Sequence, residues 1–413
     1  MTSVYYIAMG FLLALGIALY CTGQTKTKTL VFLFISLIVL AGISAIRYEV
    51  GDDYYNYMHI FIEVSDLSQS QHRYEPGFIL LIKIVQLFTN HFQWFYAVVA
   101  FLTTALVMLL IYRESQLPFL SVVLYMTMLF YYWSLSLIRQ LLAAVICSLA
   151  VRYIQKRRFL PYLLLVLIAT SIHNSALIML PFYLLAQIPF NYKTFLAVFA
   201  ISLVGFIFAP SILEIVTQYV YQGYSPDSPF GQGSSLIYGV FPFIAFLVVW
   251  SFKGRLLRES RDNNVAINFM MYAAIISLFI ARVYIVERLS IYFFLYAIVL
   301  IPNMLCTLLP SEKELSDYRI EREKLRLLKG TQKNVVRNKL KEQSTRVKDA
   351  RILFGFAVGC TVFITLLYHL FALSQDFYHI KDYQTIFNKH ATERFAASRD
   401  LYSEYLIEIG YPT

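Results

Sequence analysis

Long apolar segments alternate with short polar ones along almost the whole chain. Runs of about 17–25 apolar residues recur, which is the length that crosses the hydrocarbon core of a bilayer as a helix. Backbone groups inside a bilayer must be hydrogen-bonded within the protein, so such runs form helices. The pattern therefore predicts an all-α, polytopic transmembrane bundle of about eleven to thirteen membrane helices.

Apolar runs give the expected positions of these helices: 4–21, 29–46, 94–112, 118–133, 135–153, 159–187, 195–209, 236–252, 265–284, 289–309 and 352–373. Polar residues at 171–174 interrupt one run, so we expect it to split there into two short crossings or half-helices. The segment 78–88 is about 11 residues long, which is too short to cross comfortably. We expect it to be re-entrant or to lie along the outer interface.

The polar segments divide the chain into four parts. Residues 1–310 are the expected transmembrane core, with extracytoplasmic loops at 47–77 and 210–235. Residues 311–351 form a charged insert whose signs alternate at helical spacings, which indicates a solvated helix or a partly disordered segment. A last transmembrane helix at 352–373 and a soluble tail at 374–413 follow.

Basic clusters orient the bundle, because Lys and Arg are concentrated in cytoplasmic loops. The strongest clusters are at 156–158, at 253–261 and in the 311–351 insert, and we place all three in the cytoplasm. The remaining polar features then share the extracytoplasmic face: residues 47–75, the start of the helix at 135–153, and residues 171–174, 210–235 and 285–288.

Composition excludes an ordinary soluble protein. The 413 residues are 59% hydrophobic and only 15% charged, with a mean hydropathy of +0.61. The net charge of +10 fits cytoplasmic loops and anionic lipid, and does not indicate nucleic acid.

The four cysteines lie in apolar runs without metal-ligand spacing. The first apolar run lacks a basic start and a cleavage site, so we interpret it as a retained helix.

Arg139 and Gln140 lie near the expected outer end of an apolar helix. An arginine inside a membrane helix costs about 2.5–3.5 kcal/mol on insertion scales unless it is paired or hydrated. It either extends to the interface or binds an anion, because a guanidinium grips phosphate with two hydrogen bonds. Arg47, Arg282 and Arg288 are the further candidates for a diphosphate site, with interface anchoring as the alternative for the last two.

Acidic residues, a histidine and tyrosines supply the other candidate groups. Asp52, Asp53 and Glu75 suit general-base chemistry on a hydroxyl, with a solvated loop as the alternative. His173 is either a hydrogen-bond or proton partner for a phosphate or sugar hydroxyl, or a core residue. No HExxH or paired-histidine spacing is present, so we expect no metal site. The candidates for sugar binding are Asp53, Tyr54, Tyr57, Tyr74 and Glu287. Tyrosine is also common at membrane interfaces.

Several of these residues form four short motifs in a defined order: Arg47…Gly51-Asp52-Asp53-Tyr54…Tyr57, Glu75-Pro76-Gly77-Phe78, Ile138-Arg139-Gln140-Leu141-Leu142-Ala143 and Ala169…His173-Asn174-Ser175-Ala176-Leu177. Their ordered occurrence over about residues 1–300 resembles the EpsG family of Wzy-like bacterial polysaccharide polymerases. The insert and the tail are not part of this resemblance.

The resemblance implies an enzyme of the bacterial cytoplasmic membrane whose active site faces outward. It would transfer a growing glycan from undecaprenyl diphosphate to a hydroxyl of a lipid-linked repeat unit, without nucleotide sugar, metal or other cofactor. Its partners would be that lipid-linked oligosaccharide, the bilayer, and the chain-length regulator and flippase of the same pathway. The resemblance assigns the site to Arg47, Asp52, Glu75, Arg139, Gln140 and His173, while Arg288 rests on the residue argument.

Three other functions compete with a polymerase. A flippase or other transporter predicts polar residues near the middle of the membrane and paired halves of the fold, whereas here they gather on one face. A membrane O-acyltransferase often receives its acyl donor from the cytoplasmic side, which fits poorly with an outward-facing His173. A scaffold of an export complex suits the charged insert but leaves the buried arginine unexplained.

Overall fold

The computed structural model describes residues 3–23, 25–64, 74–211, 214, 237–283, 286–327, 330–375, 380 and 383–387. The expected loop at 210–235 lies almost entirely outside these residues, as do most of the expected tail at 374–413 and part of the 47–77 loop. The described residues form helices and one short two-stranded ribbon. The division of the chain into core, insert and tail stays a prediction.

The N-terminal part contains α1 (Ser3–Cys21), α2 (Lys26–Ala45), α3 (Tyr54–Glu63), α4 (Pro76–Gln86), α5 (Phe92–Glu114), α6 (Pro118–Thr127), α7 (Phe130–Ser136), α8 (Ile138–Gln155) and α9 (Phe159–Ile172). The chain continues through η1 (Asn174–Met179), α10 (Phe182–Leu185), α11 (Tyr192–Ile207), α13 (Ile237–Ser251), α14 (Lys253–Glu259), α15 (Asn263–Leu278), η3 (Phe279–Ala281), α16 (Val286–Phe294), α17 (Ala297–Cys306), α18 (Glu312–Leu327) and α19 (Gly330–Ser374). The ribbon pairs β1 (Arg47–Tyr48) with β2 (Gln384–Thr385) in antiparallel register.

An all-α membrane bundle is confirmed. Among the described residues, six helices are long and apolar enough to cross a membrane, and three bent pairs raise the number to nine. The pairs bend by 52° between α6 and α7, by 61° between α13 and α14, and by 41° between α16 and α17. The larger expected number also counts α9 and α11, whose 14 and 16 residues are short for a full crossing.

Some helix ends follow polar signals in the sequence and others do not. The expected interruption at 171–174 is confirmed, because α9 ends at Ile172 and the 3-10 helix η1 begins at Asn174. By contrast, the bend after α6 falls at Leu129, whose φ of 71° is left-handed, and α8 begins one residue beyond Leu137. These residues lie in apolar sequence, so the hydropathy pattern does not reveal the breaks.

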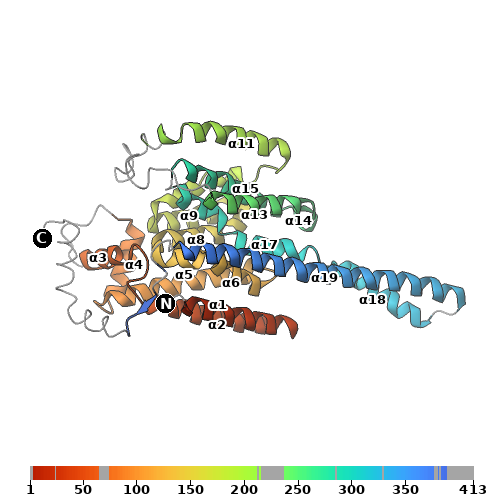
Figure 1. Cartoon of the computed structure of the whole chain (residues 1–413). Helices are drawn as coiled ribbons and strands as arrows, with labels where there is room; N and C mark the ends of the chain where they lie inside the picture. Colours follow the sequence, from red (N-terminus) through yellow and green to blue (C-terminus); the bar gives the residue numbers. More distant parts are fainter. Residues whose placement is uncertain are drawn as a thin grey trace.

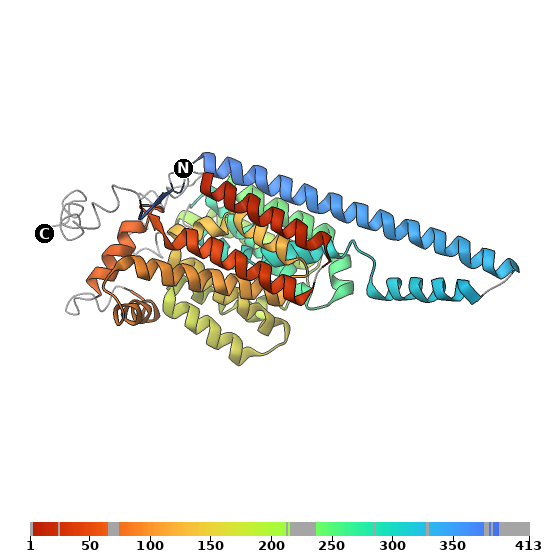
Figure 2. The same cartoon turned by 90° about the horizontal axis from the view of Figure 1, so that it is seen from below.

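The polar loops and the basic loops lie at opposite ends of the bundle (Figures 1 and 2). We name these the β1 end, which carries β1, α3 and α4, and the α14 end, which carries α14. At the α14 end, hydrogen bonds join the termini of several helices: Gln116 Nε2 donates to Glu259 Oε1 at 2.6 Å, and Asn303 Nδ2 donates to the carbonyl of Glu114 at 2.7 Å.

Helix α4 corresponds to the expected segment 78–88, which is too short to cross a bilayer comfortably. Its 11 residues extend about 16 Å, and it lies beside α3 at the β1 end (Figure 1). Leu87 and Phe88, which follow it, are among the most exposed apolar side chains. The sequence interpretation of this segment as one that does not cross therefore agrees with its length and position.

Helix α19 joins the charged insert to the last apolar segment without a break. It has 45 residues, about 68 Å of helix, and with α18 it projects well beyond the α14 end (Figures 1 and 2). Its apolar part packs on the bundle, where Thr127 Oγ1 donates to Thr365 Oγ1 at 3.0 Å and Tyr368 stacks on Phe241 at 4.0 Å. The chain then returns to the β1 end and pairs with Arg47 and Tyr48.

Two glycines allow the polar segments to approach other helices closely. Gly51 has a φ of +100°, and a Cβ there would lie 2.6 Å from the carbonyl oxygen of Leu135, beside the start of α8. A Cβ at Gly77 would overlap the Oγ of Ser171 near the end of α9. These contacts bring the 47–53 loop against the end of α7, just before the helix that carries Arg139, and α4 against the end of α9, next to His173.

We predict that Gly51→Ala lowers the unfolding temperature of the protein. A left-handed conformation costs a non-glycine residue about 1–3 kcal/mol, and the added Cβ also meets the Leu135 carbonyl. Gly42→Ala is the matched control, because a Cβ there meets nothing within 4 Å and alanine is favoured inside a helix. Thermal unfolding in detergent, followed by tryptophan fluorescence, tests this; equal midpoints for the two variants would contradict it.

Candidate active site at the β1 end

A glutamate, an arginine and a histidine from separate elements meet at the β1 end. Arg139 Nη1 lies 2.7 Å from Glu75 Oε2, and His173 Nδ1 lies 3.3 Å from Glu75 Oε1. The backbone N–H of Asn174 donates to the same Oε1 at 3.0 Å. One carboxylate thus holds α8 and the α9–η1 junction together at this point.

The sequence around Glu75 turns its side chain toward these partners. Glu75 is extended (φ −67°, ψ 138°) and precedes Pro76, the first residue of α4. Proline is well suited to this position because its missing N–H would have no helical partner. The Glu75 side chain makes no capping hydrogen bond to its own helix, so its oxygens are available to Arg139 and His173.

Arg139 stands in the first turn of α8, where the helix dipole disfavours a positive charge. The Glu75 carboxylate offsets this cost. Aromatic rings add to the stabilisation: the Arg139 guanidinium carbon lies 5.7 Å from the ring centres of Tyr57 and Tyr74 and 5.3 Å from that of Phe78. The guanidinium is therefore held at this end of the bundle.

The three side chains differ in their access to solvent. The Glu75 side chain is 7% exposed, whereas those of Arg139 and His173 are 18% and 24% exposed. Among the described residues, Arg139 Nε has no hydrogen-bond partner. Glu75 is thus the most buried member of the cluster, and Arg139 and His173 are its more exposed partners.

The surroundings of Glu75 keep it ionised. Burial raises its pKa, but the contact with His173, the charge of Arg139 and the Asn174 N–H outweigh burial and lower the pKa from 4.5 to about 2. A carboxylate with so low a pKa is a weak proton acceptor at neutral pH. Its chemistry is that of a fixed negative charge which orients its two partners.

The two aspartates of the 47–53 loop lie in different surroundings. Asp52 is exposed and Asp53 is half-buried. Burial raises the pKa of Asp53, while Arg288 and Arg139 act on it in the opposite direction. The charges of these two arginines thus reach the Asp53 carboxyl.

Helix α16 joins the site through the residue after Arg139. Gln140 is buried and its Nε2 donates to the backbone carbonyl of Arg288, next to Glu287 at the start of α16. A second link, between Ser175 Oγ and Tyr292 Oη at 2.8 Å, joins η1 to α16. The sequence analysis missed Tyr292, because it lies in an apolar run and carries no signal there.

Arg47 and Tyr54 have structural partners at the β1 end. Arg47 is 1% exposed, donates from Nη1 to the carbonyl and the Oγ of Ser44 at 3.0 and 2.7 Å, and lies 4.7 Å from the ring centre of Tyr96. Tyr54 is buried and stacks on Tyr96 at 4.8 Å. Both residues hold the loop that carries Asp53.

Arg282 is exposed at the end of η3, where its guanidinium carbon lies 5.4 Å from the ring centre of Phe206 on α11. Its contact is thus with an aromatic ring and not with Glu75. Within the part of the chain that the structure describes, no three His, Cys, Asp or Glu residues are arranged to hold a metal ion.

These features define a multi-pass helical membrane protein with a Glu–Arg–His cluster at one end of its bundle. The chain matches the EpsG family over residues 4–316. It therefore belongs to the EpsG family, a membrane protein family linked to exopolysaccharide synthesis. The match contains the whole cluster and ends within α18. Searches of curated proteins and of solved structures gave no match.

The low pKa of Glu75 predicts a dependence of stability on acid. Since its folded-state pKa of about 2 lies below the ordinary 4.5, its contribution to stability is present above pH 4.5 and is lost as pH falls from 4.5 toward 2. Glu75→Gln should unfold at a lower temperature than the wild type at pH 7. Its unfolding temperature should also fall less than that of the wild type when the pH is lowered from 4.5 toward 2. Unfolding temperatures across this pH range provide the measurement.

The control is Glu342→Gln, which replaces an exposed acid of α19 and should follow the wild-type curve throughout. Parallel curves for the wild type and Glu75→Gln between pH 4.5 and 2 would mean that Glu75 is not held as a paired carboxylate.

Proposed function

We propose that this chain is a polysaccharide polymerase of the bacterial cytoplasmic membrane. It transfers a growing glycan from undecaprenyl diphosphate to a hydroxyl of a lipid-linked repeat unit on the extracytoplasmic side. The observation that carries this proposal is the contact of one buried carboxylate, Glu75, with both Arg139 and His173. Family membership supports the general role in exopolysaccharide synthesis.

Arg139 is the proposed binding group for the donor diphosphate. As the bond between the sugar carbon and the diphosphate oxygen breaks, negative charge accumulates on the leaving oxygen. A fixed guanidinium in a partly dry site stabilises that charge without having to reorganise. The phosphates would also help neutralise Arg139 at the N-terminus of α8, a location that favours anions. Arg288 is the proposed second cation, since its charge acts on Asp53 together with that of Arg139.

His173 is the proposed proton acceptor. Its Nδ1 lies 3.3 Å from Glu75 Oε1. We propose that Nδ1 carries a proton beside this carboxylate when the substrate is bound, which leaves a lone pair on Nε2. Nε2 then accepts the proton of the acceptor hydroxyl as its oxygen bonds to the sugar carbon. Because Arg139 and His173 contact the same carboxylate, the diphosphate and the attacking hydroxyl would both be held close to the reacting sugar carbon.

Sugar contacts are assigned to the acid and the aromatic residues around this pair. Asp53 is half-buried near both arginines, and Tyr74 is partly exposed where it contacts Arg139. A carboxylate and a tyrosine in such positions suit hydrogen bonds and stacking with a sugar ring. The chain-length regulator and the flippase of the same pathway are the proposed protein partners.

We predict that Arg139→Ala reduces polymerisation about a hundredfold or more, since one lost donor to a developing oxyanion costs about 2.7–4 kcal/mol. The assay uses protein in nanodiscs with a polyprenyl-diphosphate-linked repeat unit and no nucleotide sugar, and gel electrophoresis of the products. The wild type should give a ladder of multiples. The control is Arg113→Gln, which replaces an exposed arginine at the C-terminal end of α5, at the α14 end of the bundle.

A full ladder from Arg139→Ala would refute the diphosphate assignment. A wild-type protein that gave no ladder but carried the same lipid across a sealed bilayer would be a flippase, and the polymerase proposal would fail.

A second pair of variants separates the roles of His173 and Asp53. His173→Gln keeps a hydrogen-bonding group but cannot take up a proton, so its rate should fall about 10²–10⁴-fold, the usual contribution of a general base. Asp53→Asn should act mainly by weakening acceptor binding, with a raised KM. A larger loss of kcat in Asp53→Asn than in His173→Gln would identify Asp53 as the base.

A further inference from the structure

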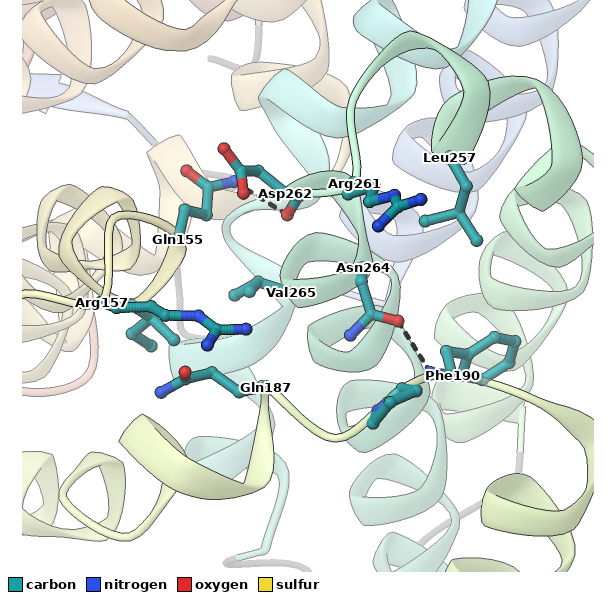
Figure 3. Close-up of a pocket in the computed structure, with 11 residues that line it drawn as sticks. Gln155, Arg157, Gln187, Phe190, Leu257, Arg261, Asp262, Asn264 and Val265 are labelled. Atoms are coloured by element: carbon teal, nitrogen blue, oxygen red, sulfur yellow. Dashed lines mark hydrogen bonds between the residues drawn. The ribbon is translucent and has the colours of Figure 1, made fainter.

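A cavity lies at the α14 end, far from Glu75. Its volume is about 460 Å³, and it is bounded by the end of α8, the segment before α11, and the connection from α14 to α15 (Figure 3). Gln155, at this end of α8, is 16 residues beyond Arg139, which corresponds to about 24 Å of helix. Neither the proposed function nor the family motifs assign any role to this cavity.

Two arginines without partners line the cavity. Arg157 follows α8 and Arg261 precedes α15, and both are exposed. Within the described residues, neither guanidinium forms an ion pair or a hydrogen bond. Figure 3 shows Arg157 beside Gln187 on one side of the space and Arg261 on another. One acid, Asp262, also lines the cavity, so the two arginines leave a net positive charge.

The backbone at Arg157, beside the cavity, is strained. Its φ is 54°, the left-handed conformation in which a helix commonly ends on glycine. The Arg158 N–H donates to the Tyr153 carbonyl at 2.8 Å, and the Arg157 N–H donates to the Ile154 carbonyl at 3.0 Å. These two bonds form a Schellman motif, in which glycine is the usual residue at the position of Arg157. An arginine here is costly for the fold, and a role for its guanidinium accounts for it.

Apolar and amide groups complete the lining. Ile154 and Val265 are buried apolar residues of the cavity wall, and Leu257 is a partly buried one. Asn264 is fixed, because its Oδ1 accepts from the Phe190 N–H at 2.7 Å (Figure 3) and its Nδ2 donates to the Ile188 carbonyl at 2.9 Å. The cavity thus combines an apolar wall with two arginines that are unpaired within the described residues, at the end of membrane-spanning helices α8 and α15.

We propose that this cavity binds the phosphate group of an anionic phospholipid in the adjoining leaflet. Guanidinium groups bind phosphate oxygens through paired hydrogen bonds, and basic pockets between membrane helices bind anionic head groups. Soluble phosphate has the same charged group but no glycerol or acyl part to contact Ile154, Leu257 and Val265. This proposal does not depend on the polymerase assignment.

Native mass spectrometry of the full chain in detergent tests the site with three probes: dioleoylphosphatidylglycerol, dioleoylphosphatidylcholine and inorganic phosphate. The wild type should retain one phosphatidylglycerol at least about tenfold more tightly than phosphatidylcholine. Arg157→Gly and Arg261→Gln should each weaken this binding about tenfold to a hundredfold, the usual effect of losing a charged hydrogen-bonding partner.

Arg157→Gly also separates binding from folding. Glycine suits the left-handed turn, so the unfolding temperature of this variant should equal or exceed that of the wild type while lipid binding falls. The matched control is Arg158→Gln, a neighbouring exposed arginine outside the cavity lining, which should bind phosphatidylglycerol as the wild type does.

Four results would overturn the proposal. The first is equal retention of phosphatidylglycerol and phosphatidylcholine by the wild type. The second is lipid binding as tight as in the wild type by Arg157→Gly and Arg261→Gln. An equal loss of lipid binding in Arg158→Gln would also overturn it, because that loss would indicate only a general attraction of the lipid to basic loops. The fourth is retention of inorganic phosphate without retention of phosphatidylglycerol, which would identify a soluble phosphate site.

Discussion

An arginine at the start of a membrane helix needs a negative partner, and much of the β1 end serves to supply one. Arg139 faces both the cost of leaving water and the positive end of the α8 dipole. Glu75 meets this need only because α4 is short, begins at Pro76 and approaches α9 at Gly77. The break in α9 then places His173 and the Asn174 N–H on the same carboxylate.

Hydropathy was enough to predict the membrane bundle, and polar interruptions were enough to predict the break at His173 and the short α4. Bends inside apolar sequence were not predictable, because the left-handed Leu129 differs in no visible way from its neighbours. The continuity of α19 was hidden as well, since its charged and apolar halves look like separate parts although both compositions are compatible with a helix. The two-residue strands are too short to give any periodic signal.

Arg139, Glu75 and His173 could each be selected from the sequence because a polar side chain in apolar surroundings is costly. Their pairing could not be derived that way, since 64 residues separate Glu75 from Arg139. Arg47 carries the same signal, and its Nη1 is bonded to Ser44, while its Nε and Nη2 have no hydrogen-bond partner among the described residues. A single sequence does not show which partners each arginine has in the folded protein.

The central claim is that the cluster of Glu75, Arg139 and His173 receives the diphosphate of a polyprenyl lipid. The most direct test is a cryo-electron microscopy structure of the protein in nanodiscs with undecaprenyl diphosphate. The account predicts diphosphate density within hydrogen-bonding distance of Arg139, at the β1 end. Diphosphate density at the α14 end, with the β1 end unoccupied at saturating lipid, would contradict it.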